Sequence, residues 1–395
     1  MSPVTPELKR AARETVESHA SELTALSQFL HDNPETGWKE VRSSAEVARV
    51  LSGFGFAIER RYLGLDTAIR ATYGSGPFTV GLVAEYDALP GLGHACGHNL
   101  IAAIAVGAGL ALSRIADAAG LTVVVYGTPA EEGGGGKIEM LERGAFAELD
   151  LAMMAHPAPV DVAEAAPLAV SHSHITYAGK AAHAAASPTE GLNAADAFTI
   201  AQVAIGMLRQ QLPPTVRVHG VVTHGGDAPN VIPDRTEGRW YMRAQTLAEL
   251  AEVESRVRAC FEAGALATGC ELRITPESRP YSEFRHDAAA LEFYKTNAVA
   301  LGRTLEVSGP ATQMALASTD MGNVSQVVPA IHPYIGVGSY PVLNHQKAFA
   351  EHCVGPIAER ALHDGAIGLA WTAIDMAGTR QRERLTRLSG REPVT

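Results

Sequence analysis

The segment Gly93-His94-Ala95-Cys96-Gly97-His98-Asn99 places a thiol two residues from an imidazole, directly after an apolar run typical of a buried strand. Further candidate ligands follow other predicted strands: the Glu131-Glu132 pair, His156 and His345. Thiolate, imidazole and carboxylate together suit a borderline-soft divalent ion such as zinc, and thiolate or carboxylate can bridge two ions. Each residue alone could be structural, but together they predict a site for two metals.

The two adjacent glutamates suggest two different roles, one in metal binding and one in proton transfer. We expect Glu132 to bind metal and Glu131 to take a proton from the attacking water, a role typically worth about 10²–10⁴ in rate. The alternative is a helix N-terminus, whose dipole favours acidic side chains. The glycines and Lys137 that follow do not form a phosphate-binding loop, because Glu131 and Ile138 occupy the outer positions of that motif.

Helices and strands alternate around these residues. The apolar spacing predicts helices over 6–31, 43–51, 100–119 and 137–143, and strands over 78–84, 121–126 and 149–154. Such alternation favours an α/β fold with a mainly parallel sheet. Ligands of parallel sheets gather at the carboxyl ends of the strands, where each candidate ligand stands.

The pattern changes near residue 170. The next elements are a strand (170–183), a helix (191–211), two strands (216–223 and 238–245), a helix (247–267) and a strand (271–275). This βαββαβ order is that of a ferredoxin-like domain. We therefore predict a catalytic domain in two parts, 1–169 and 279–395, interrupted by an inserted ferredoxin-like lid or dimerisation domain, 170–278.

Length, charge and cysteine content narrow the function. The 395 residues carry a net charge of -11, which disfavours nucleic acid and anionic membranes as partners and favours a small-molecule substrate. The N-terminus lacks an apolar signal-peptide core, and the longest apolar run, 100–112, is too short to span a bilayer. Four scattered cysteines form no disulfide framework. We expect a cytoplasmic protein.

Over nearly its whole length the chain resembles metallopeptidase family twenty, which includes aminoacylases, carboxypeptidases and dipeptidases. Asn99 and the run 318–325 resemble most the branch of p-aminobenzoyl-glutamate hydrolase and β-alanyl-lysine dipeptidase. The motifs that carry the resemblance are Ala84-Glu85-Tyr86-Asp87-Ala88-Leu89-Pro90, the Cys96 segment, Pro129-Ala130-Glu131-Glu132-Gly133, Ala155-His156-Pro157, Ala182-His183-Ala184, Asn230-Val231-Ile232-Pro233, Ser318-Thr319-Asp320-Met321-Gly322-Asn323-Val324-Ser325 and Asn344-His345.

This resemblance implies a set of metal ligands. Cys96 would bridge two divalent ions, with His98 and His156 completing one site and Glu132 and His345 the other. The ions would be zinc, with manganese or cobalt as alternatives. Glu131 would be the general base. Asp87 would hold a ligand ring or the bridging group in register, and Glu85, at a position where other branches carry a metal-binding histidine, is not expected to bind metal.

The resemblance also assigns residues of the inserted domain. His183 would reach the neighbouring subunit's site and support the developing oxyanion, so that catalysis needs a homodimer. Asn230 and Arg243 would hold the carboxylate of the substrate, for which the arginine fork is suited. For Arg243 a surface ion pair is the alternative.

The sequence thus predicts a dinuclear metal-dependent amidohydrolase. Its substrate would be an N-acyl amino acid or a p-aminobenzoyl-glutamate-like amide with a free carboxylate; the alternative is a dipeptidase acting on β-alanyl or other basic dipeptides. Two other classes stay open: a metal-free hydrolase in which His98 activates Cys96 as nucleophile, and a non-catalytic binder. Only the metal enzyme would lose activity on chelation and regain it with added metal.

Overall fold

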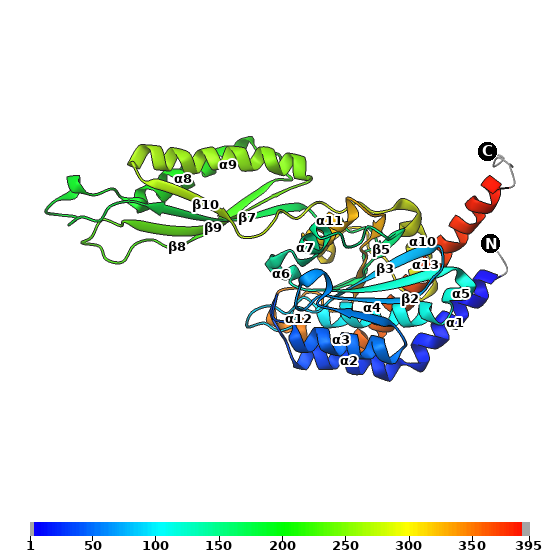
Figure 1. Cartoon of the computed structure of the whole chain (residues 1–395). Helices are drawn as coiled ribbons and strands as arrows, with labels where there is room; N and C mark the ends of the chain where they lie inside the picture. Colours follow the sequence, from blue (N-terminus) through cyan, green and yellow to red (C-terminus); the bar gives the residue numbers. More distant parts are fainter. Residues whose placement is uncertain (1–3, 389–395) are drawn as a thin grey trace. The chain divides into compact units, whose positions relative to one another are not determined.

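The structure is a computed structural model that describes residues 4–388, and the chain divides into two compact units. Unit 1 combines the chain up to Pro167 with the chain from Phe284 onward, and unit 2 comprises Leu168–Glu283. Each unit has its own hydrophobic core. The elements keep the labels of Figure 1.

Unit 1 is built on a mixed sheet. Its strands are β1 (Ala57–Arg60), β2 (Ile69–Gly74), β3 (Phe78–Glu85), β4 (Leu121–Thr128), β5 (Leu151–Met153), β6 (His156–Ala158), β11 (Ala330–Ile331) and β12 (Tyr334–Gly336). Six of them form one sheet in the order β1-β2-β4-β3-β5-β11, parallel from β4 to β11 and antiparallel at β1 and β2. β6 and β12 form a separate parallel pair.

Helices cover both faces of this sheet. They are α1 (Val4–Ser18), α2 (Ala20–Asp32), α3 (Val41–Gly53), α4 (His98–Ser113), α5 (Ala116–Ala119), α6 (Glu131–Gly134), α7 (Gly136–Glu142), α10 (Ala288–Ala300), α11 (Met321–Ser325), α12 (Lys347–Glu351) and α13 (Pro356–Leu388), with 3₁₀ turns η1 (Tyr62–Gly64) and η4 (Pro310–Leu316). Every residue of α4 is buried, because this apolar helix packs on the sheet beneath α2 and α13.

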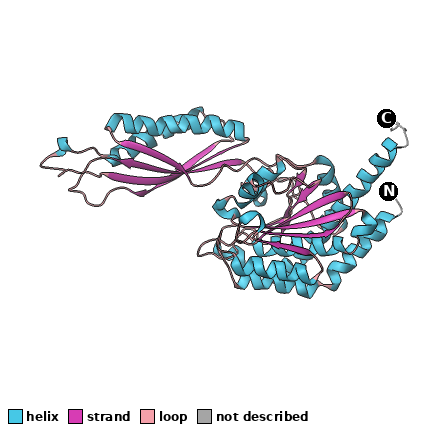
Figure 2. Cartoon of the chain, viewed as in Figure 1, coloured by secondary structure: helices cyan, strands magenta, loops and turns pink. Residues whose placement is uncertain are grey.

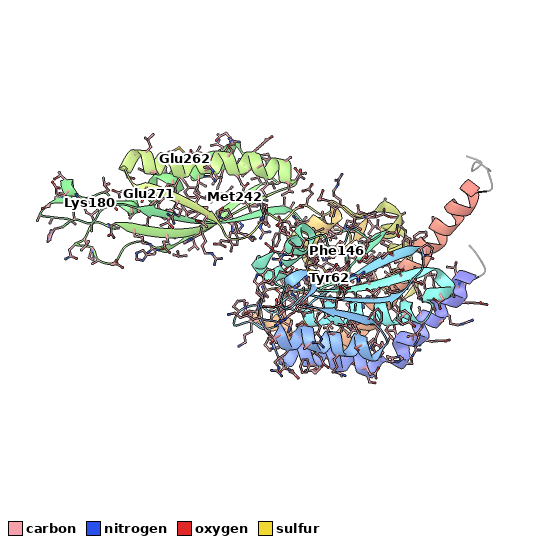
Figure 3. The ribbon with its side chains drawn as sticks, viewed as in Figure 1. Tyr62, Phe146, Lys180, Met242, Glu262 and Glu271 are labelled. Atoms are coloured by element: carbon pink, nitrogen blue, oxygen red, sulfur yellow. The ribbon has the colours of Figure 1, made fainter. Side chains whose placement is uncertain are left out.

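The alternation of β3 explains why both faces are covered. Val80 and Leu82 belong to the main core on the α4 side, and Val83 belongs to a second cluster that includes residues of α7 and α11. In that second cluster the ring of Tyr126 lies 5.8 Å from the ring of Tyr62 and 4.6 Å from that of Phe146. Tyr62 and Phe146 are labelled in Figure 3.

Three features of unit 1 differ from the sequence expectation. The helix predicted over 100–119 is divided into α4 and α5, with a break after Ser113. The helix predicted over 6–31 is two helices, because the backbone leaves the helical region at His19 (φ −111°, ψ 16°) between α1 and α2. The antiparallel strands β1 and β2 were not predicted. They are short, and their burial pattern is mixed, so their sequences lack the apolar run that marks β3 and β4.

Unit 2 is an antiparallel sheet with helices on one face (Figure 2). Its elements are β7 (Ala169–Ala178), η2 (Pro188–Glu190), α8 (Ala194–Leu208), η3 (Arg209–Gln211), β8 (Arg217–His224), β9 (Arg235–Ala244), α9 (Leu247–Thr268) and β10 (Glu271–Pro276). The strand order is β10-β7-β9-β8. Along β9, Trp240 and Met242 are buried in the core with α8 and α9, whereas Arg239, Tyr241 and Arg243 alternate onto the other face.

The first strand of unit 2 is shorter than predicted. β7 ends at Ala178, and His183 lies in the following loop, where it makes an isolated bridge to Val231. The backbone N–H of Gly179 donates instead to the carbonyl of Asp234. The predicted strand extended to His183 because the alanines at 181 and 182 do not indicate a turn.

No helix between residues 4 and 388 is both long and apolar enough to cross a lipid bilayer.

Candidate metal centre

Five segments of unit 1 meet where the parallel strands end. Asp87 follows β3, Cys96 and His98 stand at the start of α4, the glutamate pair follows β4, His156 begins β6, and His345 lies in the loop after β12. The strands β3, β4 and β5 run parallel, so their carboxyl ends share one edge. The predicted ligands therefore converge although 249 positions separate Cys96 from His345.

Cys96 is the meeting point of two imidazoles. Its Sγ lies 3.6 Å from His156 Nε2 and 3.3 Å from His345 Nε2. His156 Nδ1 lies 2.8 Å from the carbonyl oxygen of Pro157, which can only accept, so Nδ1 carries the proton and Nε2 is left to bind a metal. The same carbonyl accepts a hydrogen bond from Asn344 and links the His156 and His345 segments.

Two carboxylates lie beside the histidines. Glu132 Oε1 lies 3.3 Å from His345 Nε2 and 3.9 Å from His98 Nε2, and Glu131 Oε2 lies 4.0 Å from His98 Nε2. Asp87 contacts both the His98 ring and the Glu132 loop. Its Oδ1 lies 3.0 Å from His98 Nδ1, and its Oδ2 accepts a hydrogen bond from the Glu132 backbone N–H at 3.0 Å. Asp87 thus orients one ring and one loop at once.

Unusual backbone conformations shape the loops. Gly97 has φ +83°, and a Cβ there would lie 2.9 Å from the Pro157 side chain, so only glycine fits before His98. His345 itself has φ +67°, a region that a side-chain-bearing residue rarely adopts. Its backbone N–H donates to the carbonyl of Ala95 at 2.8 Å, which holds the strained residue against the Cys96 loop.

The electrostatics of the centre favour a thiolate. Burial opposes ionisation of Cys96, but the charge of His156 and hydrogen bonds with His156, His345 and His98 hold the pKa of the thiol well below its ordinary value. Hydrogen bonds with Cys96 and then Glu132 raise the pKa of His345 to about 11. Burial lowers the pKa of His98, but Asp87 outweighs it and the net direction is upward.

The pKa values of both glutamates are raised. Burial raises the pKa of Glu131 well above its ordinary value, and the charges of Glu132, Glu85 and Asp320 add to the shift. Burial, followed by the charge of Cys96, raises the pKa of Glu132 to about 7. Crowded carboxylates of this kind favour a bound cation, which would relieve their repulsion.

The donor atoms fit divalent metal ions. Within residues 4–388, three sets have ligand atoms that all lie within 4.8 Å of one another: Cys96 with His98 and His156, Cys96 with Glu132 and His345, and His98 with Glu131 and Glu132. Cys96 belongs to two of these sets, and each of those two combines a soft sulfur donor with harder nitrogen or oxygen donors suited to zinc or a similar ion.

The structure adds three residues to which the sequence assigned no role: Lys137, Asp320 and His332. Lys137 Nζ lies 2.5 Å from Glu85 Oε1 and 2.6 Å from Asp320 Oδ1, and all three side chains are fully buried. His332 is also fully buried, with its ring 5.7 Å from that of His156.

Of the three functional residues predicted in unit 2, His183 and Asn230 lie together and Arg243 lies apart from them. His183 and Asn230 lie together, since the Ala184 N–H donates to the Asn230 carbonyl at 3.0 Å. Arg243 stands near the far end of β9 (Arg235–Ala244). An extended strand rises about 3.4 Å per residue, so Arg243 is roughly 27 Å along the strand from Arg235. Asn230 precedes β9 and Arg243 lies near its other end, so within unit 2 the two residues stand apart.

Comparison with known proteins identifies the family. The sequence model described as peptidase family M20/M25/M40, the metallopeptidase family twenty named above, matches residues 81–361. The chain belongs to this family. Together with the relatives below, membership makes the protein a metal-dependent hydrolase of amide or peptide bonds.

Among the relatives, the Xaa-Arg dipeptidase of Mus musculus is 40% identical over 384 residues, which cover 93% of this chain and 89% of the relative. One of the subunits of p-aminobenzoyl-glutamate hydrolase from Escherichia coli (strain K12) is 32% identical over 283 residues, 66% of this chain and 59% of the relative. A dinuclear metal-binding M20 peptidase from Bacillus subtilis has the same fold, with a TM-score of 0.70 at 21% identity, covering 92% of this chain and 99% of that one.

Proposed function

We propose that this M20 hydrolase is a dinuclear dipeptidase that releases a basic amino acid with a free α-carboxylate from the C-terminal side of a dipeptide. Support for the two-metal centre comes from the short distances between the ligand atoms of Cys96, His98, His156, Glu132 and His345. The similarity over 93% of the chain to an Xaa-Arg dipeptidase supports the basic leaving group. Zinc is the proposed ion, with manganese or cobalt as substitutes.

In the proposed mechanism, Glu131 is the general base. When bound, two divalent ions would polarise the scissile carbonyl and make water acidic enough to attack at neutral pH. Glu131 accepts the proton of the attacking water and returns it to the leaving amine. Its Oε2, 4.0 Å from His98 Nε2, is close enough to the metal ligands for this transfer. Asp87 keeps His98 and the Glu132 loop in register.

We also propose that the enzyme works as a homodimer, with unit 2 as lid and dimerisation domain of ferredoxin-like topology. β8 is an edge strand, and α8 exposes Val203 (52%) and Met207 (67%), an apolar strip that a second copy could cover. In such a dimer, His183 would reach the site of the other subunit and support the developing oxyanion.

The proposed compartment is the cytoplasm. Cys96, Cys260, Cys270 and Cys353 are all free thiols, as expected where glutathione and thioredoxin keep cysteines reduced. A thiolate metal ligand also requires a reduced Cys96.

The decisive experiment is a substrate panel. Metal-reconstituted protein is incubated with dipeptides ending in Arg, Lys, Leu or Glu, with N-acyl amino acids and with p-aminobenzoyl-glutamate, and the released amine is quantified. The proposal expects the highest kcat/KM for dipeptides ending in Arg or Lys. Glu131→Ala is the inactive control, expected to keep its metal and lose about 10²–10⁴ in kcat. Preference for an acidic or neutral leaving group would contradict the proposed substrate.

The second candidate is hydrolysis of p-aminobenzoyl-glutamate or another N-acyl amino acid, the substrate class favoured by the sequence. The similarity to the Escherichia coli hydrolase supports it, but that match covers only 66% of this chain. The same panel separates the two candidates, because they differ in the charge of the leaving amino acid.

A further inference from the structure

Lys137 is a buried cation beside the metal centre. Its ammonium contacts Glu85 Oε1 at 2.5 Å and Asp320 Oδ1 at 2.6 Å, and its backbone N–H donates to Asp320 Oδ2 at 2.9 Å. The side chains of all three residues are fully buried. This cluster, hereafter the Lys137 cluster, thus holds one positive and two negative groups away from water.

Such a cluster is poor at stabilising a fold. Removing three charges from water costs more than their attraction usually returns, and an apolar trio of similar size would often be as stable. A buried ionic cluster is better explained by the arrangement that it imposes on its surroundings. The segments that it joins indicate what that arrangement is.

The Lys137 cluster ties together three parts of the centre. Glu85 ends β3, two residues before Asp87; Lys137 lies in the first turn of α7, just beyond the Glu131 loop; and Asp320 directly precedes α11. The glycines between Glu131 and Lys137 give that loop little stiffness of its own. The ionic contacts of Lys137 therefore help to hold the loop against β3, together with the hydrogen bond from the Glu132 N–H to Asp87.

Glu85 is the member closest to the proposed metal ligands. Its Oε2 lies 3.5 Å from His98 Nε2, the ring nitrogen left to bind metal once Nδ1 pairs with Asp87. A carboxylate at this distance needs only a small rotation to become a ligand itself. The ammonium of Lys137 holds its other oxygen and opposes that rotation.

We propose that Lys137 is a positioning residue that keeps the Glu85 carboxylate off the metal ions and so preserves an open coordination position for water and substrate. This inference rests on the proposed two-metal site. An added carboxylate ligand would fill that position and weaken the metal as a Lewis acid, so turnover would fall while metal stayed bound.

The test uses full-length protein reconstituted with Co²⁺, whose visible absorption reports the number of ligands. In Lys137→Met the freed Glu85 should bind, and the absorption should weaken as coordination number rises. With the best substrate of the panel, kcat should fall about 10–100-fold while KM changes little. Lys137→Met/Glu85→Gln should recover the wild-type spectrum and much of kcat. Lys9→Met, which breaks the Lys9–Asp375 pair at 2.6 Å between α1 and α13, is the matched control.

Two results would overturn the proposal. One is a Lys137→Met protein that is less heat-stable but has the spectrum and kcat of the wild type, since Lys137 would then be only structural. The other is a Glu85→Gln single variant whose Co²⁺ absorption spectrum differs from that of the wild type, because Glu85 would then already be a metal ligand. Glu85→Gln also serves if Lys137→Met does not fold; the proposal expects its spectrum to match the wild type. If the wild type cleaves no panel substrate, the spectra still test Lys137 independently of the proposed function.

Discussion

Asp87 and His98 form a buried pair in which Oδ1 of the carboxylate lies 3.0 Å from Nδ1 of the ring, and neither side chain is exposed. The same carboxylate accepts the Glu132 backbone N–H through its other oxygen. Burial opposes ionisation of Asp87, but His98 outweighs it and lowers the pKa of the carboxyl. One side chain therefore fixes the direction of an imidazole and of a carboxylate-bearing loop.

The substitution Asp87→Asn should weaken metal binding without unfolding the protein. An amide of the same shape keeps the packing, but it no longer favours Nδ1–H over Nε2–H and makes His98 a poorer ligand. We expect the metal dissociation constant to rise about 10–100-fold. Competition with a chromophoric chelator measures it, and an unchanged dissociation constant would show that Asp87 does not orient His98.

The substitution Cys96→Ser should lower metal content below two ions per chain. Serine keeps the size of the residue but removes the thiolate between the His156 and His345 nitrogens. Elemental analysis after gel filtration counts the bound metal. Cys353→Ser is the matched control, because Cys353 is a buried free thiol of unit 1 outside the three ligand sets. Full metal occupancy in Cys96→Ser would refute its bridging role.

Mixing two inactive variants should restore activity if the partner subunit's His183 completes each site. In a hybrid dimer of Glu131→Ala and His183→Ala chains, one of the two sites has an intact Glu131 and an intact His183 from the other chain. The randomly reassorted mixture should have about one quarter of wild-type activity, and the purified hybrid dimers about one half. Tagged hybrid dimers, purified after subunit exchange, allow the assay; inactive hybrids would mean that His183 acts within its own chain or not at all.

The stability of unit 2 should fall between neutral and acidic pH partly through His172. Burial, followed by the charge of Arg243, lowers the pKa of His172 to about 4. The unfolded chain takes up a proton near pH 6.5 that the folded chain excludes, so stability is lost as pH falls from about 6.5 towards 4. His172→Phe keeps a ring beside Tyr241, 4.2 Å away, and removes this proton.

Urea unfolding followed by circular dichroism at pH 7 and pH 5 checks this effect. The wild type should lose more stability between the two values than His172→Phe does. An equal loss in both proteins would mean that His172 is protonated alike in the folded and unfolded chain.

Much of the centre followed from local sequence. Cys96 and His98 are two residues apart at the start of a helix, and the two glutamates are adjacent, so their joint role needs no knowledge of distant contacts. The ends of β3 and β4 were also predictable, because their apolar, β-branched runs stop where the ligand loops begin.

Other features depend on contacts between distant parts of the chain. Lys137 and Asp320 are 183 positions apart, and the sequence excluded a phosphate loop at Lys137 without revealing the buried ion pair. Glu85 and His332 likewise show their surroundings only after folding. The separation of Asn230 from Arg243 depends on most of the extended strand β9 lying between them, which spacing in sequence does not reveal.

The sequence by itself determined the chemistry of this protein: which donor atoms exist, which strand ends carry them and which family the pattern resembles. Only the tertiary structure decided how those atoms are held, including the Lys137 cluster, the two-way support by Asp87 and the strained backbone at His345. The physical reason is the separation in sequence over which the interactions act. Periodicity and motif spacing report interactions within a few residues, whereas burial and charge pairing depend on segments that meet only in the folded chain.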